Sequence, residues 1–180
     1  MAHRALIGIG GNVGDVEDRF LKLLRHFVRS SVLSPLQSAP LFENPPFGYT
    51  DQPDFLNSLI LVQTRLDPHS LLRYLLWVEK RFGRKRSFPN APRTLDLDII
   101  FFDNLRLGSR RLRLPHPHFA ERDSVMIPLS FMTRKRRGPV SFWRRSGRKR
   151  CLRRIEAQPK GLFADMPEAV EFLDLRRRSS

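Results

Sequence analysis

The clearest candidates for chemistry are two aspartates, Asp96 and Asp98, in a mostly apolar stretch from residue 93 to residue 102. Such a stretch predicts a buried strand. Because side chains alternate between the two faces of a strand, both carboxylates share one face, about 7 Å apart along the strand. The opposite face is apolar and carries Leu95, Leu97 and Ile99.

Two carboxylates this close are unfavourable unless a cation lies near them. Each raises the pKa of the other, and burial adds a desolvation penalty. Mg²⁺ would relieve both effects, because it binds one or two carboxylates and completes its coordination with water and phosphate oxygens. The alternative is that both aspartates face solvent as the polar alternation of an edge strand, and the spacing alone fits either.

Basic residues near the aspartates favour the metal-binding alternative. Arg93 precedes the pair, a basic cluster occupies residues 84–86, and His116 follows in a Pro-His-Pro-His turn. Carboxylates for a metal beside arginines for phosphate are typical of a phosphoryl- or nucleotidyl-transfer site. A separate histidine metal site is not indicated, because the turn supplies two histidines without a third nearby ligand.

The elements that must position these residues follow from the spacing of the apolar side chains. Strands are expected at residues 4–9, 30–43, 55–64 and 93–102, and helices at about 15–28 and 67–82. A hairpin at 105–114 and a short helix within 119–129 complete the pattern. The order β-α-β-β-α-β predicts an α+β fold, a ferredoxin-like sandwich with an added hairpin and short helix.

Two long loops and one short glycine-rich segment connect these elements. The loop at 44–53 is rich in proline and aromatic residues, and the loop at 83–92 is basic. Each fits a lid over a substrate, and the proline-rich loop fits equally well a surface loop whose rings pack on the core. The glycines of residues 8–14 do not complete a nucleotide fingerprint, because Val13 stands where the third glycine is required. We interpret them as a tight strand-to-helix turn.

Positive charge is concentrated at the end of the chain. The net charge is +15, with 18 Lys and Arg against 13 Asp and Glu in residues 1–130 and 15 against 5 in residues 131–180. We therefore expect one domain over 1–130 and a basic extension over 131–180, poorly ordered because like charges repel. Charge alone fits a polyanionic ligand such as ATP, a nucleic acid, or a solvated extension.

The remaining composition favours a cytoplasmic protein. Cys151 is the only cysteine, so no disulfide can form within one chain. No apolar run approaches the roughly 20 residues of a membrane helix, and the first residues lack the features of a signal peptide.

Several of these motifs together resemble the 6-hydroxymethyl-7,8-dihydropterin pyrophosphokinase (2-amino-4-hydroxy-6-hydroxymethyldihydropteridine diphosphokinase) family. The most specific are Pro92-Arg93-Thr94-Leu95-Asp96-Leu97-Asp98-Ile99, Leu114-Pro115-His116-Pro117 and the following Arg122. The segments at 8–14 and 51–57 add to the likeness, which covers about residues 4–130.

The resemblance implies a pyrophosphokinase that transfers the β,γ-diphosphate of ATP to the hydroxymethyl group of a reduced pterin in tetrahydrofolate biosynthesis, releasing AMP. It implies two Mg²⁺ ions bridged by Asp96 and Asp98, and Arg84 and Arg93 as further catalytic residues. The implied ATP contacts are Arg84, Arg86, Arg93, Ile99, Arg111, His116, Arg122 and Glu79. The implied pterin contacts are Asn44, Pro45, Phe47, Phe55, Asn57 and Asp96. We expect a monomer with no membrane partner and no specific nucleic acid.

The chain departs from the family at the pterin end. Many members carry a tryptophan in the basic loop where this chain has Asn90, and many carry an aromatic residue just after the downstream arginine, where this chain has Asp123. The second ring against the pterin would then be lost, or would come from Phe119 or Phe47. The alternative function is a ferredoxin-like nucleic-acid-binding module that uses the basic extension, which requires exposed aromatic residues on a sheet face.

Overall fold

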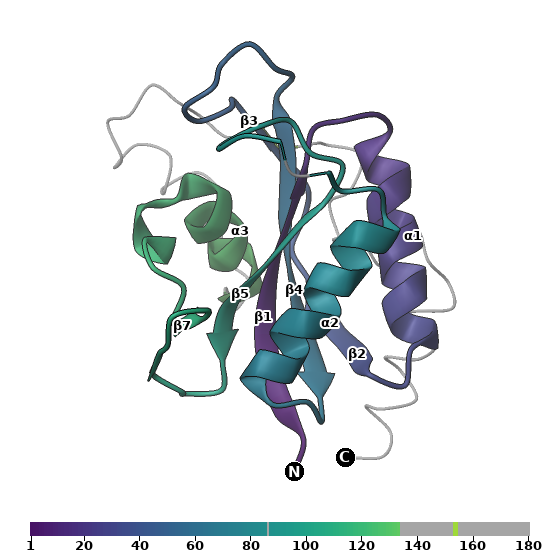
Figure 1. The fold of residues 1–180 in the computed structure, drawn as a ribbon, viewed down its shortest axis with the longest axis vertical. Helices are drawn as coiled ribbons and strands as arrows, with labels where there is room; N and C mark the ends of the chain where they lie inside the picture. Colours follow the sequence, from purple (N-terminus) through teal and green to yellow (C-terminus); the bar gives the residue numbers. More distant parts are fainter. Residues whose placement is uncertain (86, 134–152, 155–180) are drawn as a thin grey trace.

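The fold is an antiparallel sheet with helices on both faces, seen in a computed structural model that describes residues 1–85, 87–133 and 153–154 (Figure 1). Arg86 and most of the basic extension lie outside the described residues, so the expectations for them are not tested. The elements are β1 (His3–Gly11), α1 (Val16–Arg29), β2 (Leu33–Ser38), β3 (Phe42–Asn44), β4 (Phe55–Thr64), α2 (Pro68–Arg81), β5 (Asp96–Phe102), β6 (Leu107–Gly108), β7 (Arg113–Leu114), a 3-10 turn (Phe119–Glu121), α3 (Asp123–Thr133) and β8 (Arg153–Arg154).

The long strands β1 and β4 form the centre of the sheet. β1 pairs with β4 on one side and with β5 on the other, and both pairings are antiparallel. The far edge of β4 pairs with β2 along one half and with β3 along the other, and β8 pairs with β3. β6 and β7 pair with each other in a separate two-stranded sheet, which confirms the predicted hairpin. The chain is thus an α+β protein.

The first two helices begin where the sequence indicates. The Asp15 carboxylate accepts a hydrogen bond from the Asp18 amide at 3.0 Å, and the Asp67 carboxylate accepts from the amides of His69 and Ser70. These are N-caps, which satisfy amides that have no partner within the helix. Both predicted helix starts are therefore confirmed.

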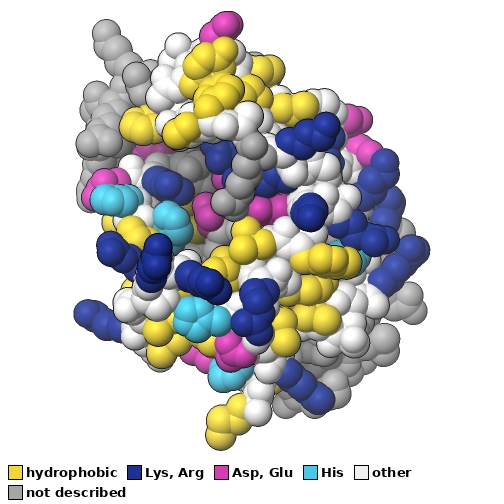
Figure 2. Space-filling model, in the orientation of Figure 1, with side chains coloured by type: hydrophobic (Ala, Val, Ile, Leu, Met, Phe, Trp, Pro, Cys, Tyr) yellow, Lys and Arg dark blue, Asp and Glu magenta, His cyan; other side chains and the backbone are white. Residues whose placement is uncertain are grey.

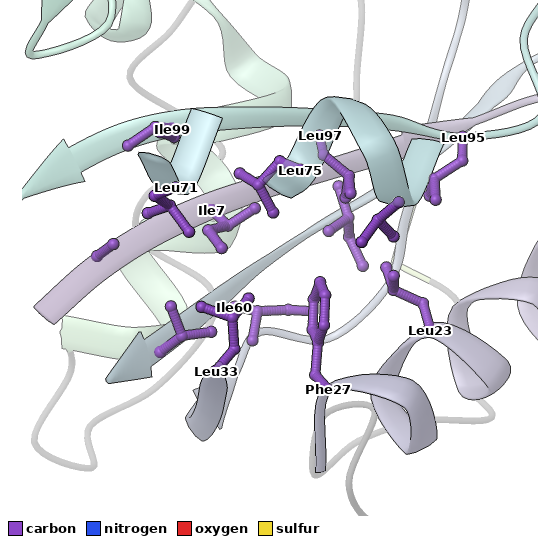
Figure 3. Close-up of a cluster of buried hydrophobic side chains, with 14 of the residues drawn as sticks. Ile7, Leu23, Phe27, Leu33, Ile60, Leu71, Leu75, Leu95, Leu97 and Ile99 are labelled. Atoms are coloured by element: carbon purple, nitrogen blue, oxygen red, sulfur yellow. The ribbon is translucent and has the colours of Figure 1, made fainter. Parts of the chain in front are cut away.

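Helices α1 and α2 cover one face of the sheet and bury the main core (Figures 1 and 3). Phe20, Leu23 and Phe27 of α1 have no exposed surface, and neither have Leu71 and Leu75 of α2. The sheet contributes Ile7, Ile60, Leu97 and Ile99 to the same cluster. The apolar side chains of the aspartate strand, β5, face this core.

Helix α3 lies against part of the opposite face. Its Val125 packs with Leu6, Leu59 and Ile100 in a second, smaller cluster. The exposed aromatic side chains among the described residues are Phe47, Tyr49, Trp77 and Phe88, and all four lie on loops or on α2. The described strands therefore offer no exposed stacking ring of the kind that the nucleic-acid alternative requires.

Three strand boundaries differ from the sequence prediction. β1 continues to Gly11, two residues beyond its expected end, so Gly10 and Gly11 belong to the strand and not to a turn. The strand expected at 30–43 is divided into β2 and β3, because the pairing with β4 shifts between Pro35 and Gln37 and ends at Ser38. Proline has no amide hydrogen to donate to a neighbouring strand. The aspartate strand begins at Asp96 rather than at Arg93, whose amide instead donates to the Asn12 side chain.

Candidate active site

The two aspartates lie together on the face of the sheet that α3 only partly covers. Asp96 is paired across the sheet with Gly10 of β1, and Asp98 with Gly8. Their side chains are 24% and 41% exposed. Leu97 is buried on the opposite face, so the alternation predicted for this strand is confirmed. Although β5 is an edge strand, its aspartates contact basic side chains rather than solvent alone.

Arg84 and Arg93 both pair with Asp96. Arg84 Nη1 contacts one carboxylate oxygen, and Arg93 Nη1 lies 3.0 Å from the other. Arg84 comes from the loop after α2 and Arg93 from the segment just before β5. Charge-assisted hydrogen bonds of this kind are among the stronger ones in proteins. With Asp98 two residues along the same face, the structure brings together all four residues expected to be catalytic.

Glu79 connects this cluster to helix α2. Its side chain is 3% exposed, accepts from Arg84 Nη1 and also accepts from the Leu97 amide at 2.8 Å. An acid in the last turn of a helix is disfavoured by the helix dipole, and these two donors offset that penalty. The side chains of Glu79 and Arg84 are both largely buried, so their ion pair lies inside the protein. Glu79 holds Arg84, and contact with ATP stays a prediction.

The positive charges around Asp98 compensate its carboxylate less completely than those that pair with Asp96. Burial raises the pKa of the Asp98 carboxyl, and the nearby charge of Asp96 raises it further. His116, Arg122 and Arg84 act in the opposite direction, and Arg122 Nη1 lies 3.7 Å from the carboxylate. Nδ1 of His116 is buried without a hydrogen-bond partner among the described residues. A cation near Asp98 would therefore be stabilising.

Residues expected at the pterin end lie on β3 and β4, in the loop that follows β3, and on β5. The Asn57 side-chain amide donates to Oδ1 of Asn44. Phe55 is 9% exposed, and the Arg93 guanidinium lies over its ring, 5.1 Å from the centroid. Phe47 is 80% exposed in the loop that follows Asn44 and Pro45. The free protein thus brings two of these residues together and leaves the Phe47 ring in solvent.

The two long loops meet at Asn12, which the sequence gave no reason to single out. Its side chain is buried and donates to Gln52 Oε1 at 2.8 Å and to the Pro53 carbonyl at 2.9 Å. It also accepts from the Arg93 amide at 2.9 Å, and Gln52 donates to the Asn90 carbonyl at 2.9 Å. Asn12 therefore ties the proline-rich loop to the basic loop and to the start of the aspartate strand.

Three expected contacts lie away from this cluster or outside the described residues. The Ile99 side chain points into the core and is 2% exposed, so a contact with ATP would have to come from its backbone (Figure 3). Arg111 is exposed in the turn between β6 and β7. Arg86 is not among the described residues. In Figure 2, acidic side chains lie in a hollow bordered by basic side chains and histidine.

Fold and site together define an α+β protein with a phosphotransfer type of site, in which a carboxylate pair stands beside arginines. The chain belongs to the 7,8-dihydro-6-hydroxymethylpterin-pyrophosphokinase family, whose sequence model matches residues 6–134. Members of this family are enzymes of folate synthesis that transfer diphosphate from ATP. The resemblance drawn from the sequence motifs is therefore confirmed.

Curated relatives agree with this membership. The chain is 40% identical over 131 residues to a 2-amino-4-hydroxy-6-hydroxymethyldihydropteridine pyrophosphokinase of Helicobacter pylori, covering 72% of this chain and 80% of the relative. A protein of the same name from Campylobacter jejuni is 40% identical over 128 residues, covering 71% and 82%. The mitochondrial folate synthesis bifunctional protein of Arabidopsis thaliana is 39% identical over 127 residues, covering 71% of this chain and 23% of the relative.

Proposed function

We propose that this chain transfers the β,γ-diphosphate of ATP to the hydroxyl of 6-hydroxymethyl-7,8-dihydropterin, with Asp96 and Asp98 holding two Mg²⁺ ions against the phosphates. The observation that carries the proposal is the aspartate pair on one face of β5 with Arg84, Arg93 and Arg122 around it. The strand order β5-β1-β4 with β2 and β3 at the far edge supports a ferredoxin-like arrangement. A monomeric, cytoplasmic enzyme fits the proposal.

The donor set fits magnesium that arrives with a nucleotide. The described residues contain no cluster of three or more His, Cys, Asp or Glu side chains arranged to hold a metal ion. Mg²⁺ is commonly bound by one or two carboxylates, and substrate phosphates and water complete its octahedron. Burial and the neighbouring charge of Asp96 raise the pKa of Asp98, and a bound cation would relieve both effects. When bound, Mg²⁺ would neutralise charge on the phosphates.

Arginines supply positive charge to the aspartate pair. Arg84 and Arg93 neutralise Asp96 directly. Once metal and nucleotide are present, both guanidinium groups become available to the phosphate oxygens, for which their planar donor geometry is suited. Nε of Arg93 and Nδ1 of His116, both buried without partners among the described residues, are additional donors for the phosphates.

Movement of the Arg93 side chain to the phosphates would also open the acceptor end. Arg93 covers the Phe55 ring in the free protein. If Arg93 moves to the phosphates, the Phe55 face becomes free for a flat pterin to stack on. Asn44, Pro45 and Asn57 would then bind the ring edge, Phe47 would close over it, and Asp96 would lie near the hydroxymethyl group. Closure of the two loops would exclude water, which competes as acceptor.

Nucleotide product analysis tests this function. The purified chain is incubated with ATP and Mg²⁺, with and without 6-hydroxymethyl-7,8-dihydropterin, and the nucleotides are separated by chromatography. The proposal predicts AMP that forms only with the pterin, together with an equal amount of pterin diphosphate. Formation of ADP would indicate transfer of a single phosphoryl group, and AMP formed without the pterin would indicate hydrolysis. Either result would contradict the proposal.

A further inference from the structure

One glycine of β1 lies between the two ends of the site. Gly10 is the direct cross-strand partner of Asn57 on β4 and of Asp96 on β5. Directly paired residues of neighbouring antiparallel strands present their side chains on the same face. Asn57 and Asp96 therefore stand on either side of a position that has no side chain, with their backbones about 10 Å apart at two strand spacings.

The Asn57 side chain occupies the space above Gly10. A Cβ atom built on Gly10 would lie 2.8 Å from Asn57 Oδ1, closer than such atoms approach one another, but 3.9 Å from the Asp96 Cβ, an ordinary contact. The Asn57 amide nitrogen is already engaged, because it donates to Asn44. The absence of a side chain at Gly10 thus lets the Asn57 carbonyl oxygen lie across β1, toward the aspartate strand.

We infer that Gly10 is a specificity-determining position for the acceptor. Because Gly10 has no side chain, the Asn57 carbonyl stays where it accepts an N–H group from the ring edge of a flat bicyclic acceptor. The hydroxyl of that acceptor reaches Asp96. This inference rests on the proposed function. A side chain at Gly10 would displace the Asn57 oxygen and leave Asp96 in place. Binding of the pterin is therefore affected, and binding of the nucleotide is not.

Gly8 provides a matched control on the same strand and face. A Cβ built there meets the Ile100 Cδ1 atom at 3.3 Å, the flexible end of a side chain, and lies 3.8 Å from the Asp98 carbonyl oxygen. Gly8→Ala and Gly10→Ala therefore make the same chemical change two residues apart. Only the second change meets a polar atom of the acceptor end.

The experiment compares the two variants in three measurements. The KM for 6-hydroxymethyl-7,8-dihydropterin is measured at saturating MgATP, the Kd for Mg²⁺ with α,β-methylene ATP by calorimetry, and folding by circular dichroism melts. Gly10→Ala is expected to raise the pterin KM about tenfold relative to Gly8→Ala, the effect of one misplaced hydrogen bond. The nucleotide Kd of both variants should stay within about twofold of wild type.

A double-mutant cycle keeps the test decisive if Gly10→Ala folds poorly. In an Asn57→Ser background the displaced oxygen is absent, so adding Gly10→Ala should leave the pterin KM unchanged and the protein folded. A further rise in KM in that background would overturn the inference. Equal pterin KM values for Gly8→Ala and Gly10→Ala in an active enzyme would overturn the inference about Gly10 and leave the proposed function standing. A wild-type chain that forms no pterin-dependent AMP would overturn both the inference and the proposed function.

Discussion

The proposed phosphate end of the site and the proposed acceptor end are held in different ways. At the phosphate end Glu79, Arg84 and Asp96 form a connected cluster whose side chains are 3%, 14% and 24% exposed. At the acceptor end the Phe47 ring is 80% exposed, and the Phe55 ring is covered by an arginine rather than open to a ligand. Ion pairs connect the side chains of the first group, whereas the second group includes an aromatic side chain that lies in solvent.

The physical reason for this difference is charge. Carboxylates in a partly buried site need compensating cations even without substrate, so the arginines must be in place before any ligand binds. An aromatic ring carries no such requirement and can remain in solvent until a partner ring arrives. Polar groups should therefore be found in position in a free enzyme of this kind, and stacking groups should complete the site only on binding.

The largest expected effect is at Asp98. Asp98→Asn should lower kcat/KM by about 10³-fold, because one of the two groups expected to bind magnesium is lost. Pterin-dependent AMP formation at saturating Mg²⁺ measures this loss. Asn104→Ala, at an exposed turn after β5, serves as the control and should retain wild-type kinetics. Equal activity of the Asp98 variant and the control would remove Asp98 from the site.

The thermal stability of Asp98→Asn should rise although its activity falls. The pKa of Asp98 is raised in the folded protein, so ionisation of its carboxyl destabilises the fold as the pH rises above the ordinary carboxyl value. Asp98→Asn removes that effect. Without metal, the variant should melt above wild type at pH 7, and the difference should disappear as the pH falls below the ordinary carboxyl pKa. A variant that melts well below wild type at pH 7 would mark Asp98 as structural.

The next effect tests whether the phosphate end is an assembled cluster. Arg84→Ala removes the guanidinium group that pairs with the buried Glu79 carboxylate, which should lower the free energy of unfolding by about 3 kcal/mol. Urea denaturation measures the change, and Arg106→Ala, at an exposed position after β5, is the matched control. Adding Glu79→Gln to Arg84→Ala should recover part of the loss. No recovery would mean that the loss does not come from the charge of Glu79.

A smaller effect is expected where the two loops meet. Asn12→Ala removes the hydrogen bonds to Gln52 and Pro53 and leaves the Arg93 amide without its acceptor. The cost should be about 1–2 kcal/mol. Amide exchange followed by mass spectrometry should show faster exchange in the loops at 45–54 and 83–92, with the helices unchanged. Uniform acceleration over the whole chain would contradict a local role for Asn12.

The smallest effect on stability is expected at Phe47. Phe47→Ala should leave the melting temperature unchanged, because the ring is in solvent. If the ring closes over the acceptor, the variant should raise the pterin KM about fivefold, by loss of one stacking contact, and should leave the nucleotide Kd unchanged. Leu105→Ala, another exposed apolar side chain, is the control. An unchanged pterin KM would exclude Phe47 from the acceptor end.

Local patterns in the sequence predicted the elements but not how the loops meet. The caps at Asp15 and Asp67 and the common face of Asp96 and Asp98 depend on nearest neighbours and on the period of a strand, and both predictions are confirmed. The contact of Arg84 with Asp96 spans 12 residues, and that of Asn12 with Gln52 spans 40. Such contacts depend on how separate loops pack, which no local pattern encodes.

The division of the strand at 30–43 and the place of Gly10 show the same limit. Pro35 and Pro40 were visible in the sequence, but where pairing would end depends on the register with β4. Gly10 was interpreted as part of a turn, yet it lies within β1 between Asn57 and Asp96. Its importance follows from which residues are its cross-strand neighbours.

The most direct test of the difference between the two ends is calorimetric titration of each substrate into the free protein. An assembled phosphate end predicts that Mg²⁺ with α,β-methylene ATP binds the free chain. An acceptor end completed by ligand predicts that 6-hydroxymethyl-7,8-dihydropterin binds at least about tenfold more tightly once the nucleotide is present. Equally tight pterin binding with and without nucleotide would show that the acceptor end is already formed and would contradict this account.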